Sequence, residues 1–295
     1  MYREKCRSYF KSCLRIFFTA GLPYVCACLN PVQNGAAGFS FGVIDVGQGL
    51  AQIAQCRDSA VIMDMGPAES YEKWRAAYRQ YGEPFIKAII ISHQHDDHWG
   101  GLGLLDSTVR WSGLVMVNPY EDTAFFRGNS APYWKERISF QTVSAGDTVF
   151  LSRDIALCCL WPDDGQGDST LESDGLQNRY SLVFAACFGE TRVLVTSDID
   201  TVAERALCLR EKEGLRASLF VVPHHGSGSA LDAAFYGYVR PQTAVISCGN
   251  PNPYGHPSTQ VLLWLGQMGV TVDCTPVCGT CMFESNGYYW QWAGP

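Results

Sequence analysis

Short apolar segments separated by polar turns recur along the chain after residue 38. The clearest is Ala88–Ile91, one alanine followed by three isoleucines. A short apolar run rich in β-branched residues is typical of a strand covered on both faces. Similar runs, bounded by turn residues, predict further strands at residues 38–45, 50–55, 60–66, 113–118, 149–151, 155–161, 193–198, 219–222 and 243–247.

Helical spacing appears between these strands. Within residues 70–81, Tyr71, Trp74, Ala77 and Tyr78 share one face of a predicted helix, and such an aromatic stripe belongs in a core. Further helices are predicted at 201–213 and 261–268, and strands within 270–292 are expected to close a second sheet. About 255 residues in this order predict a single α/β domain.

Two segments lack a regular pattern. One carries five aromatic residues after the strand at 113–118, and we expect it to overhang a cleft and to influence substrate choice. These residues are Tyr120, Phe125, Phe126, Tyr133 and Trp134. The other segment, 163–177, is rich in Asp and Gly and is predicted to be a loop.

The first thirty residues differ from the rest of the chain. Five basic residues precede an apolar stretch at 16–29, opposed only by Glu4. This order is typical of a secretory signal peptide, and Cys28 stands where a lipoprotein leader has its lipidated cysteine. We therefore expect residues 1–30 to be a leader, and the protein to be exported, periplasmic or lipid-anchored. A cytosolic protein with a basic amphipathic N-terminal helix is the alternative.

Composition narrows the class of protein. With 47% hydrophobic and 17% charged residues the chain is globular, and no stretch after Asn30 is long or apolar enough to span a bilayer. Beyond residue 28 it keeps 17 basic and 28 acidic residues, a net charge of −11. Such a charge is unfavourable for gripping long nucleic acid through its phosphates. Bound cations would still give a cleft local positive potential.

The thirteen cysteines allow two interpretations. Most lie in apolar runs, where cysteine is usually a small buried hydrophobe. Cys274, Cys278 and Cys281 have a spacing that suits a metal or a disulfide. Because no fourth ligand is near in sequence, we expect a disulfide among them in an exported protein rather than another metal site.

The six histidines fall into three tight clusters. The densest follows the strand at 88–91 with the spacing HxHxDH, in which alternation brings His93 and His95 to one cation while Asp97 and His98 turn toward a second. The other clusters are His224 with His225, and His256. Imidazole and carboxylate together predict two divalent metal ions, zinc by preference and manganese as the alternative. The following Gly100 and Gly101 are expected to let the backbone pass close beneath the site and to begin a helix.

The motif SHQHDDHWGG resembles the signature of the metallo-β-lactamase fold, and three more stretches strengthen the likeness. These are DVGQG at 45–49, VPHHGS at 222–227 and YGHP at 254–257. Together they resemble the metallo-hydrolase domain of the DNA-uptake protein ComEC and its free-standing relatives. The resemblance covers residues 39–295 and implies a four-layer αββα sandwich.

The resemblance also implies roles for single residues. Asp198 stands where the family has a metal-bridging aspartate, and Asp64 where it has a carboxylate that supports the ligand histidines, although a turn aspartate is an equal alternative from the residues alone. A strand entry at 178–184 offers Asn178 where relatives place a further histidine. Leu50 replaces an acidic residue that is usual in ComEC.

The histidine pair and the glycine-rich segment after it complete the expected site. Neighbouring side chains diverge, so we expect His225 to bind metal and His224 to act as an acid or base in the cleft, with the opposite assignment left open. His256 is expected to return to the site as a catalytic residue, or else to pack in its loop. Residues 226–229 are expected to expose backbone N–H groups that bind phosphate.

These inferences favour a two-metal hydrolase of phosphodiesters, in nucleic acid such as DNA or in a smaller nucleotide-like substrate. The metals would generate a hydroxide at neutral pH while Asp97 orients it. Because one fold hosts many chemistries, a non-phosphate ester, lactone, thioester, β-lactam or phosphocholine ester is the alternative substrate. A surface binding protein with structural metals is the third class.

Overall fold

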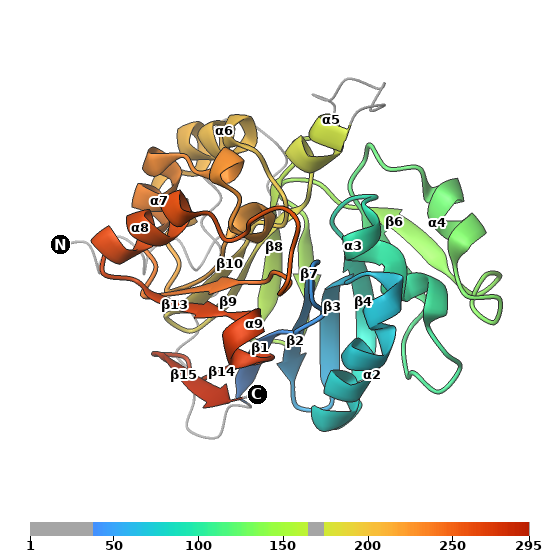
Figure 1. Ribbon diagram of the computed structural model, residues 1–295. Coiled ribbons are helices and arrows are strands. Elements are labelled where there is room, and N and C mark those ends of the chain that lie inside the picture. The colour runs from blue at the N-terminus through green and yellow to red at the C-terminus, as the bar shows by residue number, and fades with distance from the viewer. Residues whose placement is uncertain (1–37, 165–173, 295) are drawn as a thin grey trace, which may run out of the picture.

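The computed structural model describes residues 38–164 and 174–294. The expected leader and residues 165–173 of the expected loop lie outside this range. Two β-sheets pack face to face, and helices cover both outer faces (Figure 1). The predicted single α/β domain with four αββα layers is therefore confirmed.

Among the described residues, the first sheet has eight strands and lies beneath α2 (Tyr71–Gln80) and α4 (Thr123–Asn129). Its strands in spatial order are β15 (Trp290–Gly294), β14 (Cys281–Ser285), β1 (Phe39–Val43), β2 (Ala51–Cys56), β3 (Ser59–Met65), β4 (Phe85–Ile91), β5 (Leu114–Val117) and β6 (Ser139–Thr142). From β3 to β6 neighbouring strands run parallel. Their carboxyl ends therefore meet at one edge, where the metal motif follows β4.

The second sheet, again within the described ranges, has seven strands. In spatial order they are β13 (Thr271–Cys274), β12 (Thr243–Ile246), β11 (Leu219–Val221), β10 (Thr191–Val195), β9 (Val183–Phe188), β8 (Ala156–Trp161) and β7 (Thr148–Phe150). Three helices cover its outer face: α6 (Thr201–Glu211), α7 (Ala233–Val239) and α8 (Thr259–Gln267). Strands β10 to β13 are parallel, so their carboxyl ends also share an edge.

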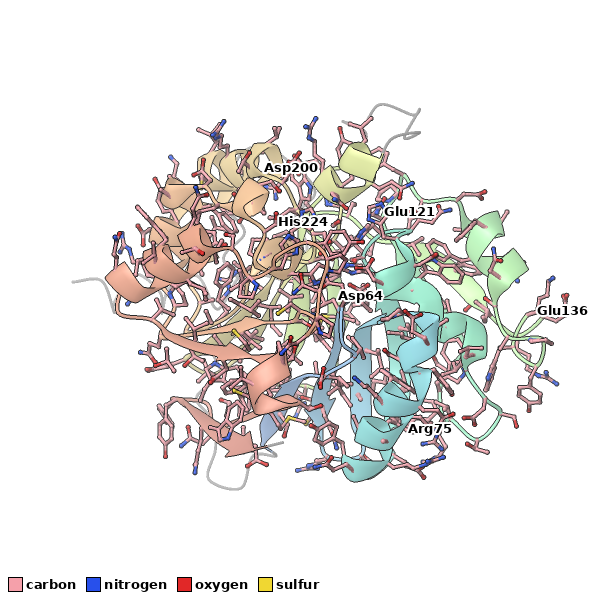
Figure 2. The ribbon with its side chains drawn as sticks, viewed as in Figure 1. Asp64, Arg75, Glu121, Glu136, Asp200 and His224 are labelled. Carbon is pink, nitrogen blue, oxygen red and sulfur yellow. The ribbon has the colours of Figure 1, made fainter. Side chains whose placement is uncertain are left out.

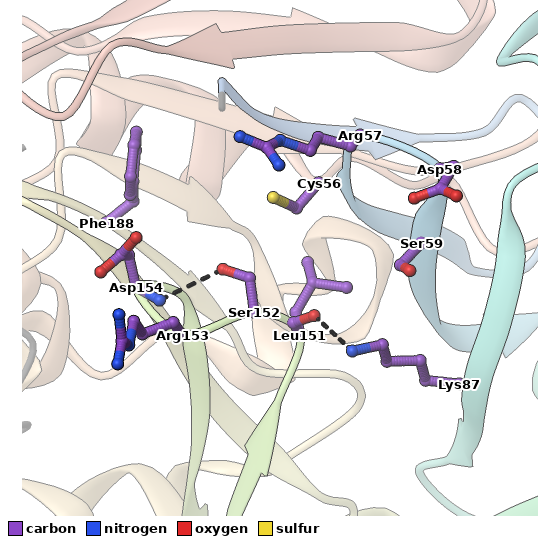
Figure 3. A pocket seen from close by; sticks show the side chains of 10 residues that line it. All are labelled: Cys56, Arg57, Asp58, Ser59, Lys87, Leu151, Ser152, Arg153, Asp154 and Phe188. Carbon is purple, nitrogen blue, oxygen red and sulfur yellow. Dashed lines mark hydrogen bonds between the residues drawn. The ribbon is translucent and has the colours of Figure 1, made fainter. Parts of the chain in front are cut away.

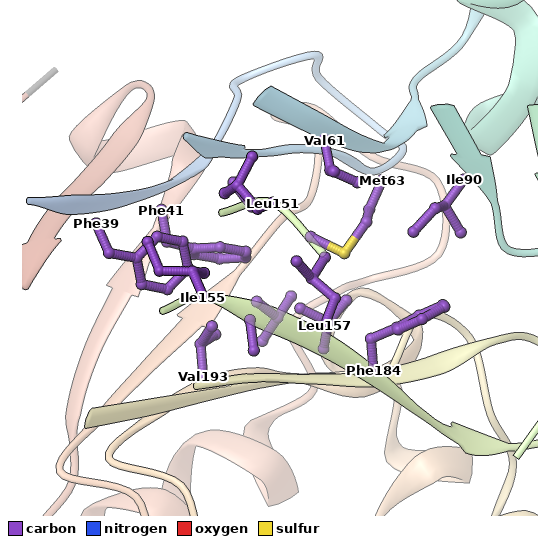
Figure 4. Packing of buried hydrophobic residues seen from close by; sticks show 14 of the residues in the cluster. Phe39, Phe41, Val61, Met63, Ile90, Leu151, Ile155, Leu157, Phe184 and Val193 are labelled. Atoms are coloured by element: carbon purple, nitrogen blue, oxygen red, sulfur yellow. The ribbon is translucent and has the colours of Figure 1, made fainter. Parts of the chain in front are cut away.

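Strand β4 shows how sequence alternation builds the layers. Ala88 and Ile90 belong to the core between the sheets, whereas Ile89 and Ile91 belong to the core beneath the outer helices. Figure 4 shows the inter-sheet core, in which Phe41 from the first sheet and Phe184 from the second are both buried. From Ala88 onward the strand is therefore apolar, because both of its faces are covered there.

The last strands correct one expectation. The segment after 270 does not close the second sheet alone: β13 joins that sheet, but β14 pairs with β1 of the first sheet, and β15 follows β14. A short helix, α9 (Thr275–Cys278), connects the two. The pattern of alternating residues identifies strands but does not specify a partner more than 200 residues away in sequence.

The aromatic segment after β5 packs differently from expectation. Phe126 is fully buried in the core beneath α2 and α4, and Phe125 and Trp134 pack against that core. These three residues therefore stabilise the outer helical layer instead of overhanging a cleft. Tyr120 follows β5 of the first sheet, and its hydroxyl donates at 2.9 Å to Asp163 O, which follows β8 of the second sheet.

The helix expected to begin at Gly100 begins earlier, inside the metal motif. Helix α3 spans Asp96–Trp99, and a 3-10 helix, η2 (Gly100–Leu104), follows it. The close backbone approach is confirmed: a Cβ at Gly101 would lie 2.6 Å from Met65 O, and one at Gly100 would lie 2.5 Å from Ala68 N. Any larger residue would push the motif away from the end of β3.

The expected disulfide is not formed. Cys274, Cys278 and Cys281 are all thiols, and they belong to none of the groups of described residues that could hold a metal ion. Cys281 is fully buried, and its thiol lies 3.6 Å from Gly279 O. Nor does any helix among the described residues have the length and apolar character needed to cross a membrane.

A cavity of about 290 Å³ opens at the amino-terminal ends of β3 and β4 (Figure 3). Lys87 lines it and donates from Nζ to Leu151 O at 2.9 Å, while Arg57 and Arg153 lie around the same space. The histidine motif follows the opposite, carboxyl-terminal end of β4. The cavity is therefore separate from the metal motif.

The packing of Phe184 generates a stability prediction. Its side chain is 1% exposed between the sheets, so Phe184→Ala should leave a cavity and lower the free energy of unfolding by about 3–5 kcal/mol. The matched control is Phe150→Ala, because Phe150 is 65% exposed; its effect should stay within about 0.5 kcal/mol. Urea unfolding followed by circular dichroism measures both, and equal losses would contradict this packing.

Candidate metal centre

The buried Asp64 carboxylate organises the edge of the first sheet. It accepts two hydrogen bonds from Ser92, at the end of β4, through the backbone N and Oγ, both at 2.8 Å. It also contacts His98 Nδ1 at 2.8 Å. Asp64 has a φ of 55°, a left-handed conformation that aspartate tolerates better than most residues. Figure 2 shows Asp64 where the two halves of the sandwich meet.

These contacts fix which nitrogen of each imidazole carries the proton. His98 Nδ1 donates to Asp64, and His225 Nδ1 donates to Ser247 O at 2.9 Å. The single hydroxyl proton of Ser92 goes to Asp64, so His93 Nδ1, 3.0 Å from Ser92 Oγ, must donate as well. When these three imidazoles are neutral, each therefore carries its lone pair on Nε2.

Those nitrogens converge on two aspartates. His98 Nε2 lies 3.3 Å from Asp198 Oδ1, and His225 Nε2 lies 3.4 Å from Asp198 Oδ2. His225 Nε2 is also 3.3 Å from Asp97 Oδ2. Asp198 follows β10 of the second sheet, and Asp97 lies in α3, which follows β4 of the first sheet. The cluster thus joins both sheets at the edge where parallel strands end.

The donor set fits a divalent cation. His98 Nε2, Asp198 Oδ1 and His225 Nε2 are buried, and each lacks a hydrogen-bond partner among the described residues. Buried polar atoms without partners are costly, and a cation between imidazole and carboxylate ligands satisfies all of them. Two groups have ligand atoms within 4.8 Å of one another: His93, His98 and Asp198, and Asp97, His98 and His225.

His98 belongs to both groups, so the expected division of the motif is less sharp than its spacing indicated. His95 lies outside these two groups, but its Nδ1 is 3.0 Å from His93 Nε2, as alternation along the motif predicted. Asp97 and His225 face each other as a pair. The structure thus brings five of the six expected ligands into the two groups and sets the sixth beside them.

The electrostatics of the cluster favour an added positive charge. Burial lowers the pKa of His98 and of His225, but nearby carboxylates, Asp198 foremost, outweigh it and raise the pKa of His225 to about 10 and that of His98 well above its usual value. Burial opposes ionisation of Asp198, yet His225 and His98 hold its pKa well below the usual range. Cation binding would therefore displace protons from these imidazoles.

Backbone torsion separates the adjacent histidines. His224 and His225 have φ values of 50° and 54°, which lie in the sparsely populated left-handed region. The turn buries the His225 side chain to 4% exposure and leaves that of His224 26% exposed, with His224 Nε2 3.8 Å from Asp198 Oδ2. Burial lowers the pKa of His224. Of the pair, His225 lies inside the cluster and His224 at its open side.

His256 lies beside the histidine pair. Its ring centroid lies 6.0 Å from that of His224 and 6.4 Å from that of His225. Gly226 makes this approach feasible, because a Cβ there would lie 2.8 Å from Pro257. Burial lowers the pKa of His256, and its Nδ1 is buried without a hydrogen-bond partner in the described part of the chain.

The DVGQG segment positions Asp97 from the other side. Leu50 N donates to Asp97 O at 3.0 Å, and a Cβ at Gly49 would lie 2.5 Å from that oxygen. Ser247 Oγ in turn donates to Gly49 O at 2.7 Å. The Leu50 side chain is buried in the inter-sheet core, so the residue that replaces an acidic one contributes packing.

Two other site expectations need correction. Asn178 lies in helix α5 (Asp174–Arg179) instead of a strand, which begins at Val183. In the glycine-rich segment, Ser227 N donates to His224 O and Ser229 N to Ser227 Oγ. These two N–H groups are therefore already occupied and are unavailable to bind phosphate.

Sequence reasoning missed the serines that hold the site together. Ser197 Oγ donates to Ser92 Oγ at 2.6 Å, which links the ends of β10 and β4 across the two sheets. Asn118 Nδ2 donates to Ser92 O at 3.0 Å, and the neighbouring Glu121 accepts from the same amide. Their signal in the sequence was a polar residue one or two positions after a buried strand, and that signal also marks ordinary turns.

The family model of the metallo-beta-lactamase superfamily matches residues 53–249, which is more than half of the chain. The chain belongs to this superfamily. The metallo-beta-lactamase fold implies divalent metal binding, in agreement with the clustered His and Asp groups. Metal-dependent hydrolysis is the general chemistry that this membership supports.

Curated relatives place the chain near ComEC within the metallo-beta-lactamase superfamily. ComE operon protein 3 of Bacillus subtilis (strain 168) is 26% identical over 260 residues, covering 82% of this chain and 32% of the relative. The uncharacterized protein YcaI of Escherichia coli (strain K12) is 26% identical over 224 residues, covering 74% and 26%. The chain thus spans about a quarter to a third of their length, and the predicted resemblance is confirmed.

A solved structure supports the fold. The metallo-beta-lactamase fold protein YhfI of Bacillus subtilis superposes with a TM-score of 0.53 at 11% identity. The match covers 84% of this chain and all of YhfI. At this identity the similarity establishes the metallo-beta-lactamase architecture alone.

The hydrogen bonds to Asp64 generate a prediction for metal binding. Asp64→Asn keeps the side-chain size and tolerates the left-handed backbone, but it removes the charge that orients His98. We expect metal affinity to fall about 10- to 100-fold. Chelator competition with the purified protein measures this. Asp58→Asn, an exposed carboxylate in the turn before β3, is the control and should bind metal normally; equal affinities in the two variants would contradict the role of Asp64.

Proposed function

We propose that the protein is a two-metal hydrolase that cleaves phosphodiesters of nucleic acid or of smaller nucleotide-like molecules. The Asp198 carboxylate carries the proposal, because it forms one group with His93 and His98, and its Oδ2 also lies 3.4 Å from His225 Nε2 of the other group. A carboxylate that reaches both groups would be suited to hold two cations.

In this proposal the ligands form two sets that share Asp198. His93, His95 and Asp198 would hold one cation, and Asp97, His98, His225 and the same Asp198 would hold the other. Imidazole and carboxylate ligands suit zinc, and manganese is the alternative. The tautomers support these sets, because in neutral His93, His98 and His225 the proton is on Nδ1 and the lone pair is on Nε2.

Two bound divalent cations supply Lewis-acid polarisation of phosphoryl oxygens and lower the pKa of water. Asp97 is 34% exposed at the mouth of the cluster, where its carboxylate orients the attacking water. His224 and His256 line the open side and move protons to or from the reacting oxygens. Because burial lowers the pKa of both imidazoles, their protonated forms are stronger acids toward an alkoxide leaving group.

A substrate panel tests this function. With metal restored, we expect turnover of bis(p-nitrophenyl) phosphate, thymidine 5′-(p-nitrophenyl phosphate) and short DNA or RNA. Asp198→Ala should abolish that turnover and reduce the metal content toward one ion or none, because two cations then repel across a short gap without their bridge. Elemental analysis accompanies the assay.

Other results would assign the site differently. Turnover confined to a lactone, thioester, β-lactam, carboxylic ester or phosphocholine ester would replace phosphodiesters with that bond. Full metal occupancy without turnover of any substrate would favour a surface binding protein. Two metals retained in Asp198→Ala would show that the bridge lies elsewhere.

A second prediction separates the adjacent histidines. His225→Ala should lose metal and activity together, because a buried imidazole leaves the ligand set. His224→Ala should keep both metals but slow turnover roughly 10²- to 10⁴-fold, with a smaller loss for nitrophenolate, which leaves without a proton. Metal content and kcat decide the matter, and metal loss in His224→Ala alone would reverse the assignment.

A further inference from the structure

The loop that carries His256 also places an aromatic ring at the rim of the metal centre. Tyr254 is 68% exposed, and its ring lies on that of His256 with centroids 5.7 Å apart and an interplanar angle of 24°. The His256 ring is in turn nearly parallel to that of His225, at 21° and 6.4 Å. Three roughly parallel rings therefore lead from the buried cluster to solvent.

Hydrogen bonds hold this loop in one conformation. Asn252 Nδ2 donates to Gly249 O at 2.9 Å and to His256 O at 2.6 Å, and His256 N donates back to Asn252 Oδ1 at 3.0 Å. The backbone on both sides of Tyr254 is thus held by Asn252. A preorganised aromatic surface loses little conformational entropy when a flat group stacks on it.

We propose that Tyr254 is a stacking platform for the nucleobase next to the scissile phosphate, so that the substrate is a phosphodiester bearing an aromatic base. The inference rests on the proposed function. The His256 ring lies between those of Tyr254 and His225, 5.7 Å from the Tyr254 centroid and 6.4 Å from that of His225, so a base on Tyr254 and a phosphate at the cluster can belong to one substrate. Stacking accepts every base, because each has a π-face, and it needs no positive charge.

The charge of the chain agrees with recognition through a base. Arg179 pairs with Asp200 and Arg210 pairs with Asp163, so these two guanidinium groups are neutralised within the protein. With a net charge of −7 over the whole sequence, contacts to many phosphates are unfavourable. A short or single-stranded substrate held by the metal centre at its phosphate and by Tyr254 at its base fits both facts.

Paired substrates with the same leaving group test the platform. Thymidine 5′-(p-nitrophenyl phosphate) carries a base, and methyl p-nitrophenyl phosphate does not. Tyr254→Leu should raise KM for the thymidine compound roughly 5- to 150-fold and leave its kcat and the methyl compound unchanged. Tyr254→Phe should restore KM, because the ring suffices. Tyr288→Leu, another exposed tyrosine in the turn before β15, should change nothing.

Binding provides a readout that does not depend on turnover. Calorimetry on the metal-loaded protein should show thymidine 5′-monophosphate binding roughly 5- to 150-fold more tightly than 2-deoxyribose 5-phosphate, and Tyr254→Leu should abolish that difference. Equal KM changes for both substrates, or an equal effect on p-nitrophenyl phosphorylcholine, would overturn the platform. Turnover of phosphodiesters without a preference for a base would reject the stacking platform but leave the proposed function standing. A Tyr254-dependent preference for the nucleotide without turnover rejects the proposed function and keeps the platform.

Discussion

Two hydrogen bonds from Ser92 to Asp64 tie the ends of β3 and β4 together at the edge where the histidine motif begins. The same carboxylate fixes His98, and Ser197 reaches Ser92 from the second sheet. A single buried anion therefore sets the position of a ligand, the tautomer of that ligand and the contact between the two sheets. Parallel strands make this arrangement available, because their carboxyl ends lie side by side.

The cluster combines features that a protein without a cation would avoid. Asp198 and the imidazoles of His98 and His225 are almost fully buried, and several of their polar atoms have no hydrogen-bond partner in the described chain. Burial penalises each charge, whereas the pairing of carboxylate with imidazole partly offsets the penalty. Local rules of good packing are broken here, as expected at a functional site.

Most of the fold was predictable because its signals are local. The apolar run at 88–91 and the aromatic stripe of α2 depend only on neighbours in the sequence, and both are confirmed. The pairing of β14 with β1 was not predictable, because every strand offers the same backbone hydrogen-bonding groups and its sequence does not identify a distant partner. The packing of Phe126 and the occupied N–H groups of Ser227 and Ser229 likewise depend on tertiary contacts that residue type does not reveal.

The candidate ligands were visible in the sequence because metal binding restricts residue types more strongly than packing does. The geometry of these ligands could not be predicted from the sequence, and the adjacent histidines show why. Both adopt left-handed torsions, so the side chains diverge by the path of the backbone and not by simple strand alternation. The strained turn is stabilised by its surroundings, since His224 N donates to Ser197 O and Ser227 N donates to His224 O. The hydrogen bond to Ser197 links the turn to the hydroxyl network of Asp64, so the buried carboxylate that orients His98 also constrains the turn that separates His225 from His224.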